Sequence, residues 1–224
     1  MSCIEASNLV KRYGSGEATV TAIADMNFTI SSGEFVGVMG VSGSGKSTLL
    51  SILGAMNAPT SGCCVVDDID IYRLSSEKRA DFRREFLGFV FQSFHLVPYL
   101  TVIENVMLPL AIVSASGNKK RRMATAALEA VGLQNKSHRL PNQISGGEKE
   151  RVAIARAIVN EPPILLADEP TGNLDTKTRG EIMDLLRQLN DSGMTIVMVT
   201  HSPECAAFAG RVLQISDGLL VSDS

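Results

Sequence analysis

Residues 40–47 have the sequence Gly-Val-Ser-Gly-Ser-Gly-Lys-Ser and satisfy the pattern G-x-x-x-x-G-K-[ST]. The apolar run 35–39 before them predicts a buried strand, and residues 47–53 after them predict a helix, which is the context that this pattern requires. Glycines let such a loop turn its N–H groups around a phosphate, and the helix N-terminus adds a partial positive charge. A flexible turn with an incidental lysine is the alternative; the strand–loop–helix context favours nucleotide binding.

The loop also supplies side chains to the predicted site. Lys46 is expected to reach the β- and γ-phosphates, and the Ser47 hydroxyl is expected to bind Mg²⁺. Thr48 is expected to add a phosphate contact. The predicted nucleotide-binding residues of the loop are Gly40, Ser42, Gly43, Ser44, Gly45, Lys46, Ser47 and Thr48.

A second apolar run, residues 164–167, ends on two carboxylates, Asp168 and Glu169. This pattern predicts a core strand of a parallel sheet whose carboxyl end faces the ligand. Asp168 would then hold Mg²⁺, and Glu169 would orient and polarise the water that attacks the γ-phosphate. An ordinary solvated turn is the alternative, and a phosphate loop on the same chain argues against it.

Residues 145–148 have the sequence Ser-Gly-Gly-Glu and open a predicted helix that runs to Val159. Ser145 with Glu148 three residues later forms a capping box, so helix initiation alone explains both residues. Capping does not need two consecutive glycines, which favour a close approach of the backbone to something else. The sharper hypothesis is a second anion site at this helix N-terminus. Its predicted contacts are Ser145, Gly146, Gly147 and Glu148.

The order of strand and helix patterns predicts the architecture. Short β-like pieces in residues 1–30 and strands around a turn at residues 67–68 predict a small antiparallel sheet beside the nucleotide core. In residues 92–159 helical signals replace the strand pattern, and Thr101 begins a capping box. Strands and helices alternate again over residues 164–215, as in an α/β fold.

Six segments stand in the order and spacing of the nucleotide-binding subunits of ATP-binding cassette (ABC) transporters, and the chain resembles this family over almost its whole length. The segments are Gly40–Ser47, Gln92, Ser145–Glu148, Ile164–Glu169, Asn173–Asp175 and His201. The resemblance implies an α/β fold with a P-loop NTPase (RecA-like) core, an N-terminal antiparallel β subdomain and an inserted helical subdomain. It implies a single ABC ATPase domain over residues 1–224, with the core and β subdomain in 1–92 and 160–224 and the helical subdomain in 93–159.

The resemblance also implies roles for residues outside the loop. Tyr13 matches the aromatic residue that stacks on adenine; the alternative is a surface tyrosine at a strand end. Gln92 matches the glutamine that touches the Mg²⁺ and attacking-water region and signals to the permease. Asp175 lies in the loop that crosses to the opposite subunit, and His201 matches the histidine that contacts the γ-phosphate. The implied catalytic residues are Glu169, His201 and Gln92, and the implied metal ligands are Ser47, Gln92 and Asp168.

Two positions depart from the family pattern. Glu148 stands where the signature usually has glutamine, and a glutamate near a γ-phosphate weakens binding by repulsion. As a capping residue Glu148 can point back at the helix start, so we expect little loss. Ser202 follows His201 where aspartate is common, which leaves the geometry of that loop open.

The family arrangement implies an ATP-dependent homodimer. Two cassettes pack head to tail about a two-fold axis, and each phosphate loop faces the 145–148 segment of the other chain. ATP then favours the closed dimer, because only that state completes both phosphate sites, and hydrolysis opens it. The implied cofactors are ATP and Mg²⁺.

Composition is consistent with a cytoplasmic subunit. The chain has 224 residues, 45% of them hydrophobic, which suffices for a sizeable core. No apolar run approaches the ~18–20 residues that span a bilayer, and residues 1–30 carry no signal-peptide pattern, so a separate permease chain is expected. A net charge of −3 gives no general nucleic-acid footprint. The predicted location is peripheral, on the cytoplasmic face of the inner cell membrane.

The connection after Gln92, residues 93–100, is unusually apolar. Core packing is one interpretation. The other is a groove that receives a cytoplasmic helix of the permease, with Phe94 and Leu96 as contact residues.

Three functional hypotheses remain open. Segments 91–98, 104–106 and 167–175 resemble the lipoprotein-release and macrolide-export subfamily, which implies an ATPase subunit that drives such a permease. The second hypothesis is a regulatory ATPase like the cell-division protein FtsE, which gates extracytoplasmic cell-wall hydrolases without transport. The third is a soluble ABC ATPase that acts on DNA or ribosomes; the chain lacks the long coiled-coil or zinc insertions typical of that class.

Overall fold

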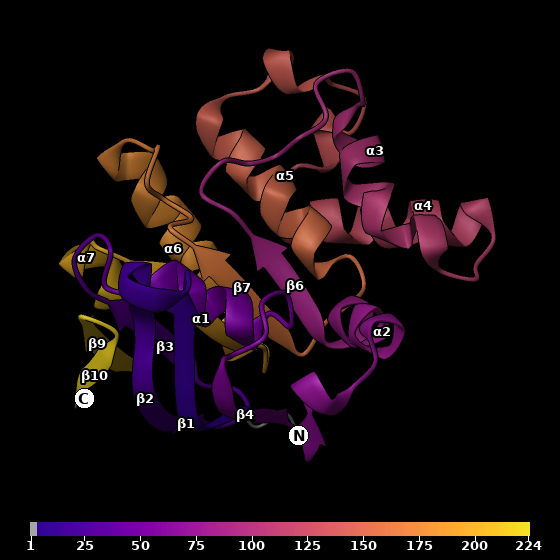
Figure 1. Ribbon diagram of the computed structural model, residues 1–224. Helices are drawn as coiled ribbons and strands as arrows, with labels where there is room; N and C mark the ends of the chain where they lie inside the picture. The colour runs from indigo at the N-terminus through magenta and orange to yellow at the C-terminus, as the bar shows by residue number, and fades with distance from the viewer. Residues whose placement is uncertain (1–3) are drawn as a thin grey trace.

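Two β-sheets form the body of the chain (Figure 1), and the structure, a computed structural model, describes residues 4–224. The first sheet is antiparallel with the order β2-β1-β4-β5. Its strands are β1 (Ile4–Tyr13), β2 (Val20–Ile30), β4 (Ser61–Val66) and β5 (Ile69–Asp70). The predicted antiparallel sheet is confirmed, but the prediction of short pieces in residues 1–30 is wrong, because β1 and β2 have 10 and 11 residues.

The second sheet has the order β10-β9-β3-β8-β7-β6 and is parallel from β9 to β6. Its strands are β3 (Phe35–Met39), β6 (Leu87–Val90), β7 (Ile164–Asp168), β8 (Thr195–Thr200), β9 (Arg211–Ser216) and β10 (Leu219–Asp223). Only β10 pairs antiparallel, with β9, within this sheet of the described chain. The apolar runs in β3, β7 and β8 are therefore the central strands, as expected for a sheet covered on both faces.

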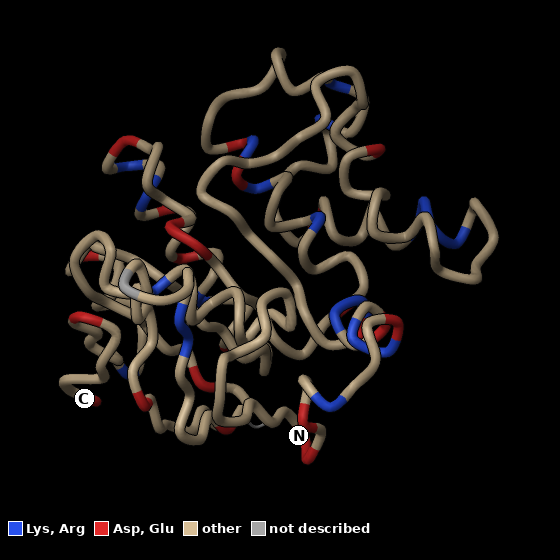
Figure 2. The backbone as a smooth tube through the Cα atoms, in the orientation of Figure 1, with Lys and Arg blue, Asp and Glu red and all other residues tan. Residues whose placement is uncertain are grey.

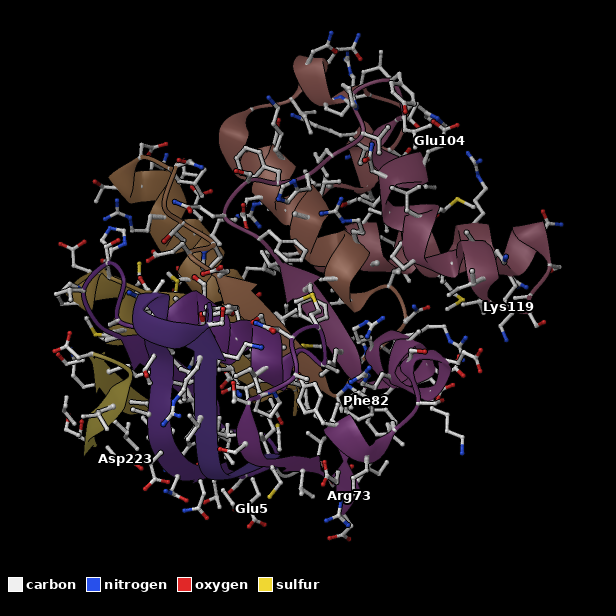
Figure 3. All side chains as sticks on the ribbon, in the orientation of Figure 1. Glu5, Arg73, Phe82, Glu104, Lys119 and Asp223 are labelled. Carbon is white, nitrogen blue, oxygen red and sulfur yellow. The ribbon has the colours of Figure 1, made fainter. Side chains whose placement is uncertain are left out.

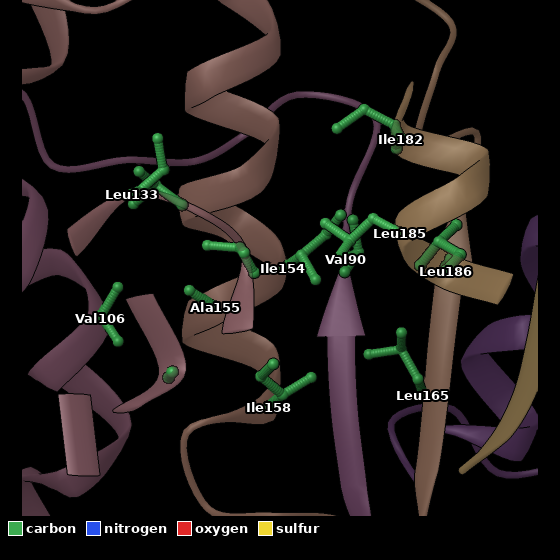
Figure 4. Packing of buried hydrophobic residues seen from close by; sticks show 14 of the residues in the cluster. Val90, Val106, Leu133, Ile154, Ala155, Ile158, Leu165, Ile182, Leu185 and Leu186 are labelled. Carbon is green, nitrogen blue, oxygen red and sulfur yellow. The ribbon is translucent and has the colours of Figure 1, made fainter. Parts of the chain in front are cut away.

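Alternate residues of β7 face opposite sides of this sheet, as strand geometry requires. Ile164 and Leu166 pack with α1 and the antiparallel sheet, whereas Leu165 and Ala167 pack with the helices on the other side. Figure 4 shows the second cluster, in which Ile154 and Ile158 project toward Val90. Each fully buried side chain of this kind contributes about 1.5–3 kcal/mol.

Seven α-helices occur in the described residues. They are α1 (Lys46–Leu53), α2 (Ser76–Phe86), α3 (Val102–Met107), α4 (Gly117–Ala130), α5 (Gly146–Ile158), α6 (Thr176–Asp191) and α7 (Pro203–Ala206). Short 3-10 segments are Gly16–Ala18, Ile71–Arg73, Leu108–Ile112, Gln134–Lys136 and Pro141–Gln143. Helices α3, α4 and α5 gather on one side of the molecule, away from the antiparallel sheet, and form the predicted inserted helical subdomain (Figure 1).

The helix starts follow the capping signals of the sequence. Thr101 and Glu104 make a complete capping box at α3, with the Thr101 N–H donating to Glu104 Oε2 at 2.8 Å. Gly132, with φ +73°, follows the end of α4. Helices α3, α4 and α5 thus lie inside the predicted range 93–159. The two boundaries of the helical subdomain stay predictions.

Two polar residues are buried in the helical subdomain. Asn105 accepts a hydrogen bond from the Val97 N–H at 2.7 Å and donates to the carbonyls of Val97, Leu100 and Thr101. It therefore fastens the connection after Gln92 to α3. Glu150 on α5 is also buried, and burial raises the pKa of its carboxyl to about 8, so the neutral acid predominates at pH 7.

Charged residues of both signs are interspersed over the chain (Figure 2). The basic run 119–122 begins α4 at the outer end of the helical subdomain, with Ser116 as its N-cap. Lys119 projects from this outer end (Figure 3). The run is therefore the exposed start of a helix.

Candidate functional site

The phosphate loop joins the carboxyl end of β3 to α1. Gly45 is the N-cap residue of α1 with φ +104°, and a Cβ at this position would lie 2.3 Å from the carbonyl oxygen of Ala22. A Cβ on Gly40 would lie 2.2 Å from the carbonyl oxygen of Ile215. Backbone therefore surrounds the loop so closely that both positions require glycine, which leaves the N–H groups of the first turn of α1 to a ligand.

A turn near the C-terminal end of the chain braces this loop. The Gly218 N–H donates to the Ser44 carbonyl at 3.0 Å, and the Ala24 N–H donates to the Gly218 carbonyl at 2.8 Å. The sequence carries no signal for this contact, because the partners lie far apart in the chain and interact only through backbone groups.

The Lys46 side chain is only 8% exposed and lies inside the loop. Its Nζ donates to the carbonyl oxygens of Gly40 and Val41, both at 2.8 Å. The loop thus holds a compact positive charge at the place where its N–H groups converge, which suits a bound polyphosphate.

Ser47 and Asp168 bring two oxygen ligands together. The Ser47 hydroxyl donates to Asp168 Oδ1 at 3.3 Å, which joins the start of α1 to the end of β7. Burial raises the pKa of Asp168, and the Ser47 hydrogen bond opposes this shift. Mg²⁺ prefers oxygen ligands and is commonly held by one or two carboxylates plus substrate phosphates. The donor set therefore fits Mg²⁺, whose charge would offset the burial of Asp168.

Glu169 and His201 meet where the neighbouring strands β7 and β8 end. His201 Nδ1 lies 2.8 Å from Glu169 Oε1. Glu169 has φ +48°, held by its N–H donating to the Val199 carbonyl and its carbonyl accepting from the Gly172 N–H, both at 3.0 Å. A side-chain-bearing residue in the left-handed region costs about 1–3 kcal/mol, and such strain clusters at functional sites. Glu169 lines the space beside the phosphate loop.

These residues line one cavity of about 670 Å³. The predicted residues that line it are Ser42, Gly43, Gly45, Lys46, Ser47, Thr48, Gln92, Asp168, Glu169 and His201. Gly40 and Ser44 are buried within the loop itself. Ala22 and Val199 also line the cavity and were missed, because an apolar strand residue carries no chemical signal in the sequence.

Tyr13 is not among the residues that line this cavity. It ends β1, its hydroxyl accepts a hydrogen bond from Asn57 Nδ2 at 2.5 Å, and Lys11 Nζ lies 5.1 Å from its ring centroid. Tyr13 is 43% exposed. The role in adenine stacking stays a prediction.

Asp175 does not line the cavity either, and within the chain it acts as the N-cap of α6. It accepts hydrogen bonds from the Thr178 N–H at 3.0 Å and from the Thr178 hydroxyl at 2.6 Å. The preceding Asn173 donates from Nδ2 to the Gln92 carbonyl at 3.1 Å. The 173–175 loop therefore lies beside Gln92, and its contact with a second subunit stays a prediction.

The predicted capping box at α5 is present. The Ser145 N–H donates to Glu148 Oε2 at 2.8 Å, and the Glu148 N–H donates to Ser145 Oγ at 3.3 Å. A Cβ on Gly147 would lie 2.2 Å from Thr178 Cγ2, so packing of α5 against α6 explains this glycine. A Cβ on Gly146 would make only an ordinary contact, 3.6 Å from Leu174 Cδ2, so packing within the chain does not explain it.

The Ser145–Glu148 segment and the phosphate loop line different cavities of one chain. Ser145, Gly147 and Glu148 line a separate cavity of about 400 Å³ with residues of α6. Within one chain, the structure therefore does not bring the two predicted phosphate-binding elements together.

Residues 23–172, which hold the phosphate loop, Glu169 and the Ser145–Glu148 segment, match the protein family described as ABC transporter. The chain belongs to the ABC transporter family. As an ATP-binding cassette of this family it is an ABC ATPase, and the predicted fold class and enzyme class are confirmed.

Two relatives agree with this assignment. The cassette is 46% identical over 217 residues to the ABC transporter ATP-binding protein YvrO of Bacillus subtilis, covering 97% of this chain and 95% of the relative. It is 47% identical over 220 residues to the macrolide export ATP-binding/permease protein MacB of Chlorobaculum tepidum, covering 98% of this chain and 34% of that longer protein. The predicted resemblance to the macrolide-export subfamily is confirmed by this similarity.

A solved structure has the same fold. The cassette MJ0796 of Methanocaldococcus jannaschii, in a dimeric post-hydrolysis state bound to ADP and Pi, superposes with a TM-score of 0.89 at 43% identity. The match covers 99% of this chain and 97% of that chain.

A second cavity, of about 470 Å³, lies between α2, β6 and the helical subdomain. Phe89, Phe91, His95 and Ile112 line it, together with Arg156 of α5. Phe94 and Leu96, the two residues predicted as groove contacts, do not line this cavity and pack partly buried against the core cluster. This packing agrees with the core interpretation, and a permease contact at these two residues stays a prediction. Their apolar character cannot distinguish the two roles, because both bury the side chain.

Within residues 4–224 no helix is both long and apolar enough to cross a bilayer.

Proposed function

We propose that this ATP-binding cassette hydrolyses ATP as a homodimer and drives a separate permease of the lipoprotein-release/macrolide-export type. The main support for the dimer is that the phosphate loop and the Ser145–Glu148 segment are separated within one chain and line different cavities. A two-fold, head-to-tail pair would complete each site with residues of the other chain. The dimeric ADP- and Pi-bound structure of the related MJ0796 cassette supports this arrangement.

In the proposed site the chain binds the triphosphate through the loop. Lys46 exchanges its hydrogen bonds to two carbonyl oxygens for hydrogen bonds to the β- and γ-phosphates. The new bonds are stronger, because both the ammonium group and the phosphate are charged. Ser47, Asp168 and Gln92 would hold Mg²⁺, which would neutralise charge on the phosphate oxygens. Tyr13 stacks on adenine.

Glu169 and His201 act at the γ-phosphate. The Glu169 carboxylate orients the attacking water and accepts its proton. The bond from the water oxygen to the γ-phosphorus forms as the bond from that phosphorus to the β–γ bridging oxygen breaks, and ADP leaves. His201 uses Nδ1 for the contact with Glu169, which leaves Nε2 as the ring nitrogen for the γ-phosphate. In the dimer Ser145, Gly146, Gly147, Glu148 and Asp175 approach the nucleotide of the other chain.

The dimer is tested by the concentration dependence of hydrolysis. Since the active species needs two chains, the rate per chain should rise with protein concentration below the dimerisation constant and then level off. Phosphate release at saturating ATP over a 100-fold dilution series measures this dependence. A rate per chain that stays constant in a preparation shown to be monomeric by light scattering would contradict the proposal.

The permease and the location form the second part of the proposal. MacB of Chlorobaculum tepidum combines an ATP-binding and a permease function in one longer chain, of which this cassette spans the equivalent of 34%. We infer that the partner of this cassette is a separate chain and that the cassette lies on the cytoplasmic face of the membrane. The groove of about 470 Å³ beside α2 is the proposed contact surface, since it is lined largely by apolar and aromatic residues.

Ile112 offers a test of the groove. It is 71% exposed and lines the cavity, so Ile112→Asp should disrupt docking and leave ATP hydrolysis by the isolated cassette unchanged. Co-purification from the native membrane fraction, with identification of the bound permease, measures docking. Val20→Asp is the matched control, because Val20 is 64% exposed on β2 and outside the groove. Unchanged recovery of the permease with Ile112→Asp would contradict the assignment of this groove as the contact surface. Recovery of a cell-division protein in place of an export permease would indicate a regulatory role.

A further inference from the structure

The Glu148 carboxylate is held through both of its oxygens. Oε2 accepts the Ser145 N–H at 2.8 Å, and Oε1 accepts a hydrogen bond from Lys136 Nζ. Lys136 ends the 3-10 segment Gln134–Lys136 and thus reaches α5 from the connection that follows α4. Arg151, which lines the same cavity, is engaged by Glu181 and the Val131 carbonyl.

The contact has an electrostatic consequence at the start of α5. The Lys136 hydrogen bond is the largest cause of a lowered pKa at Glu148, so Glu148 is ionised at neutral pH. An uncompensated carboxylate in the first turn would cancel the positive field of the helix N-terminus, which the proposed function assigns to the phosphates of the other chain. Glutamine at this position, usual in the family, would create no such charge.

We propose that Lys136 is a positioning residue for the phosphate site between the two chains. It neutralises Glu148 and holds the carboxylate back against the Ser145 amide, so that the N–H groups of α5 keep their attraction for an anion. The inference rests on the proposed dimer. The opposite charges of Lys136 and Glu148 offset each other. The pair therefore takes the place of the single neutral glutamine that is usual in the family.

A double-mutant cycle tests the pair. Lys136→Met should raise the ATP concentration for half-maximal hydrolysis, and for half-maximal dimer formation, by roughly two- to tenfold, as expected for an uncompensated charge in the first turn of a helix. Glu148→Gln alone provides the background of the cycle. In that background Lys136→Met should cause no further rise in either ATP concentration, because no charge then remains to be neutralised.

Two controls separate electrostatics from packing. Lys136→Arg keeps the charge and should behave like the unmodified protein. Lys119→Met removes an equal charge from the outer end of α4 and should have no effect (Figure 3). The effect of Lys136→Met should also shrink at 1 M salt, where the screening length is about 3 Å.

The outcomes are distinct. Rescue by Glu148→Gln supports the proposal. A double variant as weak as Lys136→Met, or a Lys136→Met variant that loses thermal stability with no change in ATP dependence, overturns it in favour of a purely structural bridge. Failure of the underlying dimer has a different signature, since the unmodified protein itself would then show no ATP-dependent association.

Discussion

Replacing Glu169 with glutamine should lower the rate of ATP hydrolysis by about 10²–10⁴-fold, the range expected for loss of a catalytic base, and should leave ATP affinity almost unchanged. The amide keeps an oxygen that can accept a hydrogen bond from His201 Nδ1, so the geometry at the ends of β7 and β8 is preserved. Only the negative charge that polarises the attacking water is lost. Because hydrolysis opens the proposed dimer, the variant should accumulate as an ATP-bound dimer.

Two measurements check this prediction. Phosphate release gives the rate, and light scattering with and without ATP gives the mass of the complex. Glu129→Gln on α4 is the matched control, because Glu129 is exposed and lies outside the nucleotide cavity. A Glu169→Gln variant that hydrolyses ATP at the unmodified rate would contradict the proposed catalytic role of Glu169. Slow hydrolysis without a stable ATP-bound dimer would instead contradict the proposed dimer.

Local signals in the sequence predicted most of the architecture. The apolar runs at β3, β7 and β8 and the capping boxes at Thr101 and Ser145 were sufficient because each depends on neighbours within a few residues. Helix α2 was not predicted. It buries a single large side chain, Phe82, among mostly charged residues, so it has almost no apolar periodicity.

The residues of the candidate site that belong to a sequence motif could be predicted. The predicted residues that line the cavity beside the phosphate loop come from four short segments, and strand order in a parallel sheet is enough to bring the ends of these segments together. Contacts between distant segments could not be predicted. The bond between Lys136 and Glu148, the packing of Gly147 against Thr178 and the brace from Gly218 each depend on how whole elements are placed.

Gly147 illustrates the difference between a pattern and its cause. The two consecutive glycines favoured a close approach of the backbone to a ligand. In the structure Gly147 is needed for α5 to pack on α6, whereas packing within the chain does not explain Gly146. The hypothesis of an anion site at this helix therefore depends on Gly146 and on the N–H groups of the first turn, which lie beside it.

Lys46 is the residue on which nucleotide binding itself should depend most. Lys46→Met should weaken ATP binding by about 10²–10⁴-fold, because two charge-assisted hydrogen bonds of about 1.5–3 kcal/mol each are lost. Isothermal titration with ATP measures the affinity. Thermal denaturation checks that the protein stays folded, since the Gly40 and Val41 carbonyls also lose their donor.

Lys46→Arg separates charge from shape at this position. The lysine is 8% exposed in a loop that is closely surrounded at Gly40 and Gly45, so a planar guanidinium cannot occupy the place of the compact ammonium group. We therefore expect Lys46→Arg to bind ATP nearly as weakly as Lys46→Met, even though it keeps the positive charge. If Lys46→Arg restored binding, net charge alone would be sufficient and the close fit of the loop around Lys46 would have no part in recognition. If Lys46→Met bound ATP as tightly as the unmodified protein, the loop would bind phosphate through its N–H groups alone.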